Sequence, residues 1–304
     1  MENNTLSIIV PCYNSSNRIV DCINAIKLSL ESLSYKFNFE IIIVDDGSTD
    51  GSSDIIKNIS EVKIITHTEN KGLSSARNSG INHSLSEYIA FIDSDVIVEK
   101  NWFQKILNLL INNSSIVGVT GHLKCPLNKK TTLLDIYLFS NYRGIRNIDS
   151  SAPLLYKWFV FSNTIIRRSV LEKIGTFDEN LSSYGGEDTE LSIRINKKFS
   201  NNLRKLCNAT AYHYSDKTLK KYMKNMYDYG LNNFNYIIRK HPHYKKSLEQ
   251  NITHSFKGYI IFNPINRLVC VLFLKFIKHP LLIKFLIISS FVRGVRISKN
   301  RLID

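Results

Sequence analysis

The sequence predicts an α/β fold, in which helices cover both faces of a mostly parallel sheet, followed by a helical C-terminal region. Over the first two hundred residues, short apolar runs alternate with segments of helical periodicity. Polar clusters come directly after three of these runs, and beyond Tyr214 the chain becomes basic and strongly apolar. Its 304 residues, 43% of them hydrophobic, suffice for one sizeable core and an appendage, which excludes disordered and fibrous classes.

In the first half of the chain, the apolar runs are expected to be buried strands and the amphipathic segments helices. The expected strands are residues 6–10, 40–44, 62–66 and 88–92. The expected helices are residues 19–33, 72–84 and 101–112. Because strand and helix alternate, right-handed crossovers and a Rossmann-like, mostly parallel sheet follow.

The next hundred residues are less regular. Residues 117–119 and 158–166 are expected to be strands, and a short helix over 169–174 is expected to end at the following glycine. The segment GGEDTELSIR, residues 185–194, indicates the start of another helix with acidic residues in its first turn. We therefore predict a domain over residues 1–215 and a separate helical region over residues 216–304.

Three polar clusters mark the ends of predicted strands. They are Pro11-Cys12-Tyr13-Asn14, Asp45-Asp46-Gly47-Ser48 and Asp93-Ser94-Asp95. Ligands of open α/β sheets bind beyond the carboxyl ends of the strands, so the clusters are expected to line one crevice. Carboxylates there suit a divalent cation and phosphate groups. The alternative is that each cluster is only turn chemistry.

The excess of positive over negative charge is confined to the last hundred residues of the chain. The net charge is +14, and residues 205–304 carry 18 Lys or Arg against 4 Asp or Glu, whereas residues 1–204 carry 22 of each. Such a field indicates an anionic surface as the partner of this region, either membrane headgroups or nucleic acid.

The apolar stretch over residues 265–292 favours the membrane. Lys275, Lys278, Pro280 and Lys284 interrupt it, so neither half has the roughly twenty apolar residues that span a bilayer. A pair of amphipathic helices lying in the membrane surface is the favoured interpretation, and a re-entrant hairpin is an alternative. A helical subdomain packed on the core, or on a second copy of the chain in a homo-oligomer, is the competing explanation.

The five cysteines are widely spaced and form no metal-binding pattern, which is typical of reduced thiols. The first residues show no secretory signal. We therefore expect the protein at the cytoplasmic face of the cell membrane, bound peripherally or by a re-entrant segment.

Taken together, the motifs resemble the family 2 glycosyltransferases of bacteria, which have the GT-A fold. The matching blocks are SIIVPCYN (7–14), IIIVDDGSTD (41–50), ENKGLSSARNSGI (69–81), AFIDSD (90–95), and IGTFDENL followed by GGEDTELSIR (174–194). They occur in the family's order, which is more specific than any single block. The resemblance covers about residues 5–215.

The resemblance implies a nucleotide-sugar donor held by the first three blocks. Asp45 would accept a hydrogen bond from the base, and the chain around Pro11 and Tyr13 would cradle it. Arg77 would pair with diphosphate oxygens, although a surface helix arginine is the alternative. Asp93 and the adjacent Ser94 would lie beside the ribose.

The resemblance also implies a metal ion and a catalytic base. Asp95 would bind Mn²⁺ or Mg²⁺, and His213 would be a further ligand or a merely structural histidine. Asp188 would be the base of an inverting reaction, with Glu187 beside it to orient the acceptor. Acidic residues also complement the dipole at a helix start, which is the alternative for this pair.

The expected function is therefore inverting, metal-dependent transfer of a sugar, most simply from a UDP-sugar, to a glycan or lipid-linked acceptor in surface polysaccharide synthesis. One alternative is a sugar nucleotidyltransferase, which would need a glycine-rich phosphate loop where Pro11–Asn14 stands. A second is a nucleic-acid-binding protein that uses the basic tail. The long apolar stretches after Ile265 speak against it, so no nucleic acid is expected as a partner.

Overall fold

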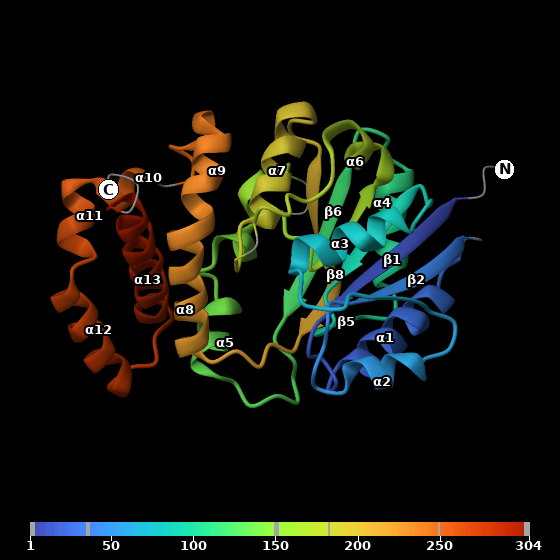
Figure 1. Ribbon diagram of the computed structural model, residues 1–304, viewed down its shortest axis with the longest axis horizontal. Helices are drawn as coiled ribbons and strands as arrows, with labels where there is room; N and C mark the ends of the chain where they lie inside the picture. Colours follow the sequence, from blue (N-terminus) through green and yellow to red (C-terminus); the bar gives the residue numbers. More distant parts are fainter. Residues whose placement is uncertain (1–3, 35–36, 149–151, 182, 249, 301–304) are drawn as a thin grey trace. The chain divides into compact units, whose positions relative to one another are not determined.

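A computed structural model describes residues 4–34, 37–148, 152–181, 183–248 and 250–300. The chain forms two compact units (Figure 1). The first unit is made of Met1–Leu127, Ile148–Asn180 and Arg194–Ser215, and the second of Asn128–Asn147, Leu181–Ile193 and Asp216–Asp304. One boundary between them falls after Ser215, but the second unit also takes two earlier segments. The division into domains at residue 215 stays a prediction.

The first unit holds an eight-stranded sheet with the order β3-β2-β1-β4-β7-β6-β8-β5. Parallel pairing joins β3, β2, β1 and β4, and also β6 with β8, whereas the pairs β4–β7, β6–β7 and β5–β8 are antiparallel. The predicted α/β class is confirmed, and the sheet is mixed. The strands are β1 (Thr5–Cys12), β2 (Asn38–Asp45), β3 (Lys63–Thr66), β4 (Tyr88–Ile92), β5 (Val96–Val98), β6 (Gly118–Lys124), β7 (Asn163–Arg167) and β8 (Leu203–His213).

Helices cover both faces of this sheet, as predicted. Alternate residues of β1, among them Leu6, Ile8 and Val10, share a buried core with apolar residues of α1 and α4. The intervening Ile9 faces α3, where a methyl group added to Gly80 would come within 2.4 Å of the Ile9 side chain. The helices of this unit are α1 (Ile19–Glu31), α2 (Ser52–Lys57), α3 (Leu73–Asn82), α4 (Trp102–Ile111) and α6 (Arg168–Ile174), with the short helix η2 (Tyr156–Trp158).

One helix belongs to both units. Helix α7 (Glu187–Lys198) lies in the second unit up to Ile193 and in the first from Arg194 onwards. It follows the two glycines of the GGED motif, and its three acidic residues, Glu187, Asp188 and Glu190, lie in the first turn, where they complement the helix dipole. Lysines occupy the last turn.

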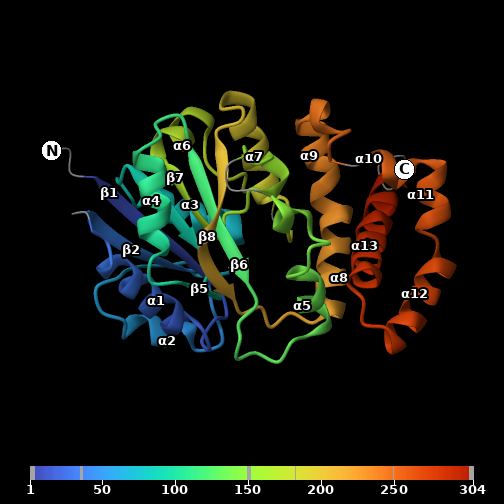
Figure 2. The same cartoon turned by 180° about the vertical axis from the view of Figure 1, so that it is seen from behind.

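The second unit is helical. Helix α13 runs through its centre, with Ile283, Ile287 and Val295 buried against α5, α8 and α9. In Figures 1 and 2, α11 and α12 lie along one edge of this unit, with α13 between them and α8. The remaining elements are α5 (Leu133–Leu138), η1 (Gly144–Asn147), α8 (Leu219–Asp228), the π-helical η3 (Tyr229–Asn233), α9 (Phe234–Lys240), η4 (Pro242–Tyr244), α10 (Gln250–His254), α11 (Phe256–Ile261), α12 (Pro264–Phe276) and α13 (Pro280–Asn300).

The C-terminal apolar stretch is interrupted where the sequence predicts it. Helix α12 ends at Phe276, and α13 starts at Pro280, whose ring fits the first turn of a helix but not its interior. In the described part of the chain, no helix combines the length and apolar character needed to cross a bilayer.

Candidate functional site

The polar loops after β1, β2 and β4 meet at one edge of the sheet in the first unit. The registers place Cys12 opposite Asp45 and bring β4 alongside β1. The hydroxyl groups of Ser15 and Ser94 lie 2.7 Å apart, which joins the first and third loops. The amide of Ser15 donates to the Ser52 hydroxyl at 2.8 Å, which joins the first and second. The predicted convergence of three strand ends is therefore present.

Asp50 fastens two of these loops to each other. Its carboxylate accepts hydrogen bonds from the backbone amides of Ser16 and Ser52, both at 3.0 Å. Desolvation, the largest single cause, raises the pKa of Asp50, but the several hydrogen bonds from Ser52 and Ser16 together outweigh it and lower the pKa to about 2. A lowered pKa means that the ionised acid stabilises the folded loops above its ordinary value of 3.8, and that this contribution is lost as the pH falls through 2. The sequence pattern alone does not single out this residue.

The three donor-binding candidates at the ends of β1 and β2 differ in exposure. Pro11 is buried, and Tyr13 is 49% exposed just beyond the strand, where its ring is accessible for stacking. Asp45 is 1% exposed and accepts hydrogen bonds from the amide of Ser48, at 3.0 Å, and from the hydroxyl of Ser53. Each carboxylate oxygen has a second lone pair, so these bonds leave Asp45 able to accept a further donor.

Asp46 is a structural neighbour of the site that the sequence analysis did not assign. Its carboxylate accepts from the amides of Lys71, at 3.0 Å, and Gly72, at 2.9 Å, and lies 2.6 Å from Nδ1 of His67. The other ring nitrogen of His67 lies 2.8 Å from the Ser79 hydroxyl. This buried network ties the end of β2 to the start of α3, the helix that carries Arg77.

Arg77 is a buried residue of the site, not a surface arginine. Its guanidinium is 1% exposed, donates to Asp93 at 3.1 Å and lies 5.1 Å from the centre of the Phe177 ring. The next residue, Asn78, exchanges two hydrogen bonds with the backbone of Phe177, at 2.9 and 3.0 Å. The motifs ENKGLSSARNSGI and IGTFDENL thus meet at α3, and Arg77 holds the first carboxylate of the Asp93-Ser94-Asp95 cluster.

Asp95 and His213, the two predicted metal ligands, lie side by side. The antiparallel pairing of β5 with β8 aligns Val96 with His213, and this places Nε2 of His213 3.2 Å from Oδ2 of Asp95. The side chain of His213 is 22% exposed and that of Asp95 is 32% exposed. Two ligands in adjacent octahedral positions, each about 2.1 Å from Mg²⁺, lie about 3 Å apart. The pair therefore fits a shared Mg²⁺ or Mn²⁺ ion.

Within the described residues, no group of three or more His, Cys, Asp or Glu side chains is arranged to hold a metal ion. Among these residues, Asp95 and His213 are the pair that would hold such an ion.

The turn that precedes the predicted catalytic residues depends on glycine. Gly185 and Gly186 have φ angles of +80° and +100°, which other residues rarely adopt. Asn233, at the end of the π-helical segment η3, donates to the carbonyl oxygens of Ser183, at 2.9 Å, and Gly185, at 2.7 Å. Helix α7 therefore begins at a turn that a buried asparagine holds in place. Both Glu187 and Asp188 are half-buried in its first turn.

Two tyrosines, Tyr184 and Tyr229, lie near Glu187. The phenols of Tyr184 and Tyr229 both have raised pKa values, because they are desolvated and because negative charge, that of Glu187 included, lies nearby. Both phenols are therefore neutral at physiological pH. They can donate hydrogen bonds beside the acidic pair but cannot act as bases there.

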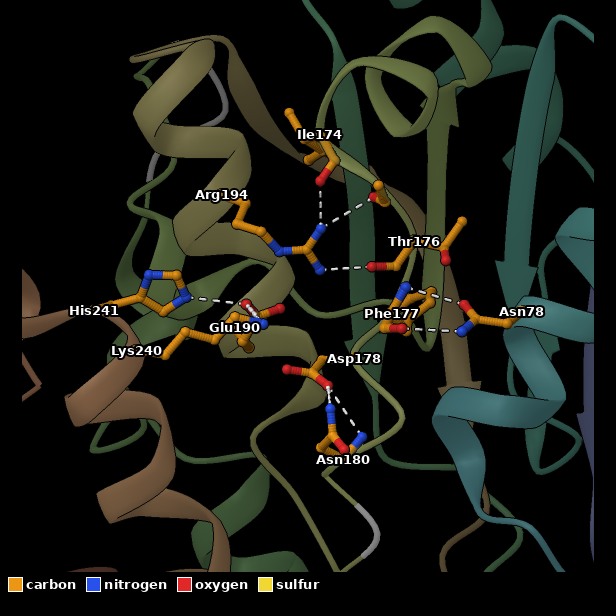
Figure 3. Close-up of polar contacts among 11 residues, drawn as sticks. Asn78, Ile174, Thr176, Phe177, Asp178, Asn180, Glu190, Arg194, Lys240 and His241 are labelled. Atoms are coloured by element: carbon orange, nitrogen blue, oxygen red, sulfur yellow. Dashed lines mark hydrogen bonds and ion pairs between the residues drawn. The ribbon is translucent and has the colours of Figure 1, made fainter.

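Helix α7 is anchored at two points, its first turn and its middle (Figure 3). The carboxylate of Glu190, fully buried, lies 2.9 Å from Nζ of Lys240 and 3.0 Å from Nε2 of His241, both in the second unit. In the first unit, the guanidinium of Arg194 donates to the carbonyl oxygens of Ile174 and Thr176, each at 2.6 Å. A buried carboxylate needs such partners, so Glu190 fixes the first turn of α7 against α9.

We expect Gly186→Ala to destabilise the protein more than Gly51→Ala does. Both positions have a positive φ. A methyl group added at Gly186 would lie 2.7 Å from the Ile237 side chain and 2.8 Å from that of Tyr229, whereas one added at Gly51 would have no other atom within 4 Å. The difference in the free energy of unfolding should be about 1 to 3 kcal/mol, the usual cost of overpacking. Urea unfolding of the two variants measures it, and equal losses would contradict this account of the turn.

The candidate residues divide between the units. Pro11, Tyr13, Asp45, Arg77 and the Asp93-Ser94-Asp95 cluster lie in the first, together with His213, and Glu187 and Asp188 lie in the second. The structure brings the donor and metal candidates together and places the two acidic residues in one helical turn. That Asp188 meets Asp45 and Asp95 in one pocket stays a prediction.

Residues 7–175 match the model of the protein family described as "Glycosyl transferase family 2". The chain belongs to this family. The family that the motifs resemble is thereby confirmed, and with it the enzyme class, over the strands and loops that carry the donor candidates. The match disfavours the sugar nucleotidyltransferase alternative.

Curated relatives agree with this assignment. An uncharacterized glycosyltransferase of Rickettsia felis is 30% identical over 202 residues, which is 66% of this chain and 31% of that protein. Glycosyltransferase AglE of Haloferax volcanii is 28% identical over 191 residues, 59% of this chain and 58% of the relative. The chain thus spans about a third of the length of the Rickettsia protein and little more than half that of AglE.

Solved structures show the same fold. A mannosyltransferase from Pyrobaculum calidifontis, in complex with GDP-Man and Mn²⁺, superposes with a TM-score of 0.64 at 16% identity, covering 95% of this chain and 86% of the other. TarS of S. aureus in complex with UDP gives 0.53 at 16% identity, covering 98% and 91%. At this identity the likeness establishes the GT-A fold alone.

Proposed function

We propose that this chain is an inverting, metal-dependent glycosyltransferase that moves a sugar from a UDP-sugar to a glycan or lipid-linked acceptor. The observation that carries the proposal is the pairing of Asp95 with His213 at the edge of the sheet where the Arg77–Asp93 pair also lies. The metal-binding pair suits the charge of a nucleoside diphosphate, and the buried Arg77 beside it holds the carboxylate of Asp93 in position. The ligands of the mannosyltransferase and TarS structures support the same class of donor.

In this proposal the first unit holds the donor. Tyr13 stacks on the base, and Asp45 accepts a hydrogen bond from it. Asp93, kept in position by Arg77, accepts from a ribose hydroxyl, and Ser94 keeps the loop joined to Ser15. Asp95 and His213 would hold Mn²⁺ or Mg²⁺. When bound, the ion neutralises the negative charge that develops on the departing diphosphate.

The second unit supplies the base. The carboxylate of Asp188 removes the proton of the acceptor hydroxyl as its oxygen bonds to the anomeric carbon of the sugar. The bond from that carbon to the diphosphate breaks on the opposite face, so the configuration inverts and the nucleoside diphosphate leaves. Glu187 orients the acceptor, and the neutral phenols of Tyr184 and Tyr229 lie near it.

The proposal also includes the acceptor and the location of the enzyme. A basic, apolar C-terminal region next to a sugar-transfer domain suits an acceptor carried by a membrane lipid. We place the enzyme at the cytoplasmic face of the cell membrane, in the synthesis of surface polysaccharide.

The proposal is tested with a panel of nucleotide sugars. Release of nucleoside diphosphate from UDP-, GDP- and dTDP-sugars is measured with Mn²⁺, with Mg²⁺ and with EDTA. We expect turnover of a UDP-sugar that stops with EDTA and returns when the metal is restored. Equal turnover in EDTA would rule out metal dependence, and turnover confined to a GDP- or dTDP-sugar would replace the proposed donor.

A further inference from the structure

An apolar face on α11 and α12 stands out from the rest of the second unit. Of the two predicted amphipathic segments, α13 is a core helix, whereas α12 buries only one of its hydrophobic residues, Cys270. The outward residues of the two helices define the docking face, and each is at least 44% exposed. They are Phe256, Tyr259, Ile260, Ile261, Ile265, Leu268, Val269, Leu272, Phe273, Phe276 and Ile277.

The docking face is held in a fixed arrangement from behind. Arg296 of α13 lies 4.1 Å from the centre of the Tyr259 ring and donates to the carbonyl oxygens of Thr253, at 2.9 Å, and Phe262, at 3.1 Å. The rings of Phe262 and Phe285 stack with centres 5.6 Å apart. On α12, the thiol of Cys270 contacts the carbonyl of Leu282 at 3.3 Å. The inward contacts thus fix α11 and α12 while their outward side chains stay exposed.

Exposure of this extent is unusual for a protein surface in water. Phe256 is 81% exposed, Ile265 72% and Phe276 85%. Contiguous apolar surface of this kind marks an interaction site. In the first unit, Leu85 and Leu127 are similarly exposed, at 94% and 88%, but they lie in separate segments of the chain.

Charge identifies the occupant of the docking face. Residues 250–300 contain eight Lys or Arg and no Asp or Glu. Lys257, Lys275 and Lys278 are exposed on the same two helices and the turn after them. A second copy of this face would bring like charges together around its apolar centre, which opposes self-association. Apolar side chains bordered by lysines instead match the acyl chains and anionic headgroups of a lipid bilayer.

We propose that α11 and α12 form a peripheral docking face that lies in the surface of an anionic membrane, with Phe273 and its neighbours in the acyl region and the three lysines at the headgroups. Helix α13 stays in the protein and supports them. The inference rests on the membrane location given under the proposed function and adds which helices bind the lipid. It concerns lipid binding only. It is therefore tested without donor, metal or acceptor, so its failure and that of the enzymatic proposal are distinguishable.

The test is sedimentation of the full chain with vesicles of phosphatidylcholine alone or of phosphatidylcholine mixed with phosphatidylglycerol, whose anionic headgroups give the surface a negative potential. We expect binding to the anionic vesicles that weakens as salt is raised. Joint replacement of Leu272 and Phe273 by Asp should lower the partition coefficient at least tenfold, and Lys275→Glu with Lys278→Glu should abolish the preference for anionic lipid. The matched control, Leu85→Asp, changes an equally apolar exposed residue of the first unit and should bind as the unaltered chain does.

A second measurement tests the proposal even if the double Asp variant does not fold. In Phe273→Trp, the added fluorescence should shift to the blue with anionic vesicles, and in Leu85→Trp it should not. The proposal is overturned if the unaltered chain ignores the vesicles or if the double Asp variant binds as well as the control. It is also overturned if size-exclusion chromatography shows a dimer that the double Asp variant abolishes, because a second copy would then be the occupant.

Discussion

Replacing Asp188 with asparagine is expected to lower the rate of sugar transfer by about 100- to 10,000-fold, the usual contribution of a general base. The amide has the shape of the carboxylate but does not accept a proton at neutral pH. Asparagine is tolerated near the start of a helix, so α7 should keep its first turn. The initial rate of nucleoside diphosphate release, at saturating donor and acceptor, measures the effect.

Nucleotide affinity separates a lost base from a lost fold. Isothermal titration of Asp188→Asn with the nucleoside diphosphate and Mn²⁺ should give the affinity of the unaltered chain. The control is Asp54→Asn, since Asp54 is 83% exposed on α2 and pairs only at the surface with Lys57. That variant should transfer sugar normally. A rate for Asp188→Asn within threefold of the control would show that another group removes the proton.

Replacing Asp95 with alanine is expected to weaken metal-dependent nucleotide binding by 100-fold or more and to abolish transfer with it. Loss of a group that only supports a metal ligand already costs about 10- to 100-fold in metal affinity or activity, and a ligand itself should cost at least as much. Titration with the nucleotide in Mn²⁺ and in EDTA measures the metal-dependent part.

The same titration applied to His213→Ala tests the second predicted metal ligand. If its Nε2 is a ligand, as the 3.2 Å approach to Asp95 suggests, His213→Ala should also weaken the binding that depends on Mn²⁺ and leave the binding in EDTA unchanged. If Asp95→Ala binds nucleotide in Mn²⁺ as tightly as the unaltered chain does, Asp95 holds no ion. Equal losses of nucleotide binding in Asp95→Ala and Asp188→Asn would contradict their separate roles.

Local pattern predicted the elements on which the donor residues stand. The run at residues 88–92 became β4 without any change of bounds, because five consecutive buried residues followed by a carboxylate admit little else. Asp45 and Arg77 were also identifiable, since each lies in a motif block that the family keeps in order. The burial of Arg77 was less evident, because helical periodicity does not show which face of a short polar helix turns inward.

Contacts between distant segments could not be predicted. Strand β8 alternates buried and exposed residues imperfectly, so its pairing with β5, which brings His213 to Asp95, leaves little trace in the sequence. The bonds of Asn233 to the GGED turn join residues about fifty positions apart. For α13, the apolar composition fits a core helix and a membrane helix equally well, and only its packed neighbours distinguish them.

The π-helical turn at Tyr229–Asn233 has a consequence for how this enzyme tolerates insertions and deletions. Such a turn contains one residue more than an α-helical turn would. The extra residue is absorbed within this turn, so removing it would restore regular winding and leave α9 facing nearly the same way. Lys240 and His241 would still face Glu190. Homologues that lack the extra residue are thus expected to keep a carboxylate at the position of Glu190, and the change would fall on the turn itself, where Asn233 donates to Ser183 and Gly185.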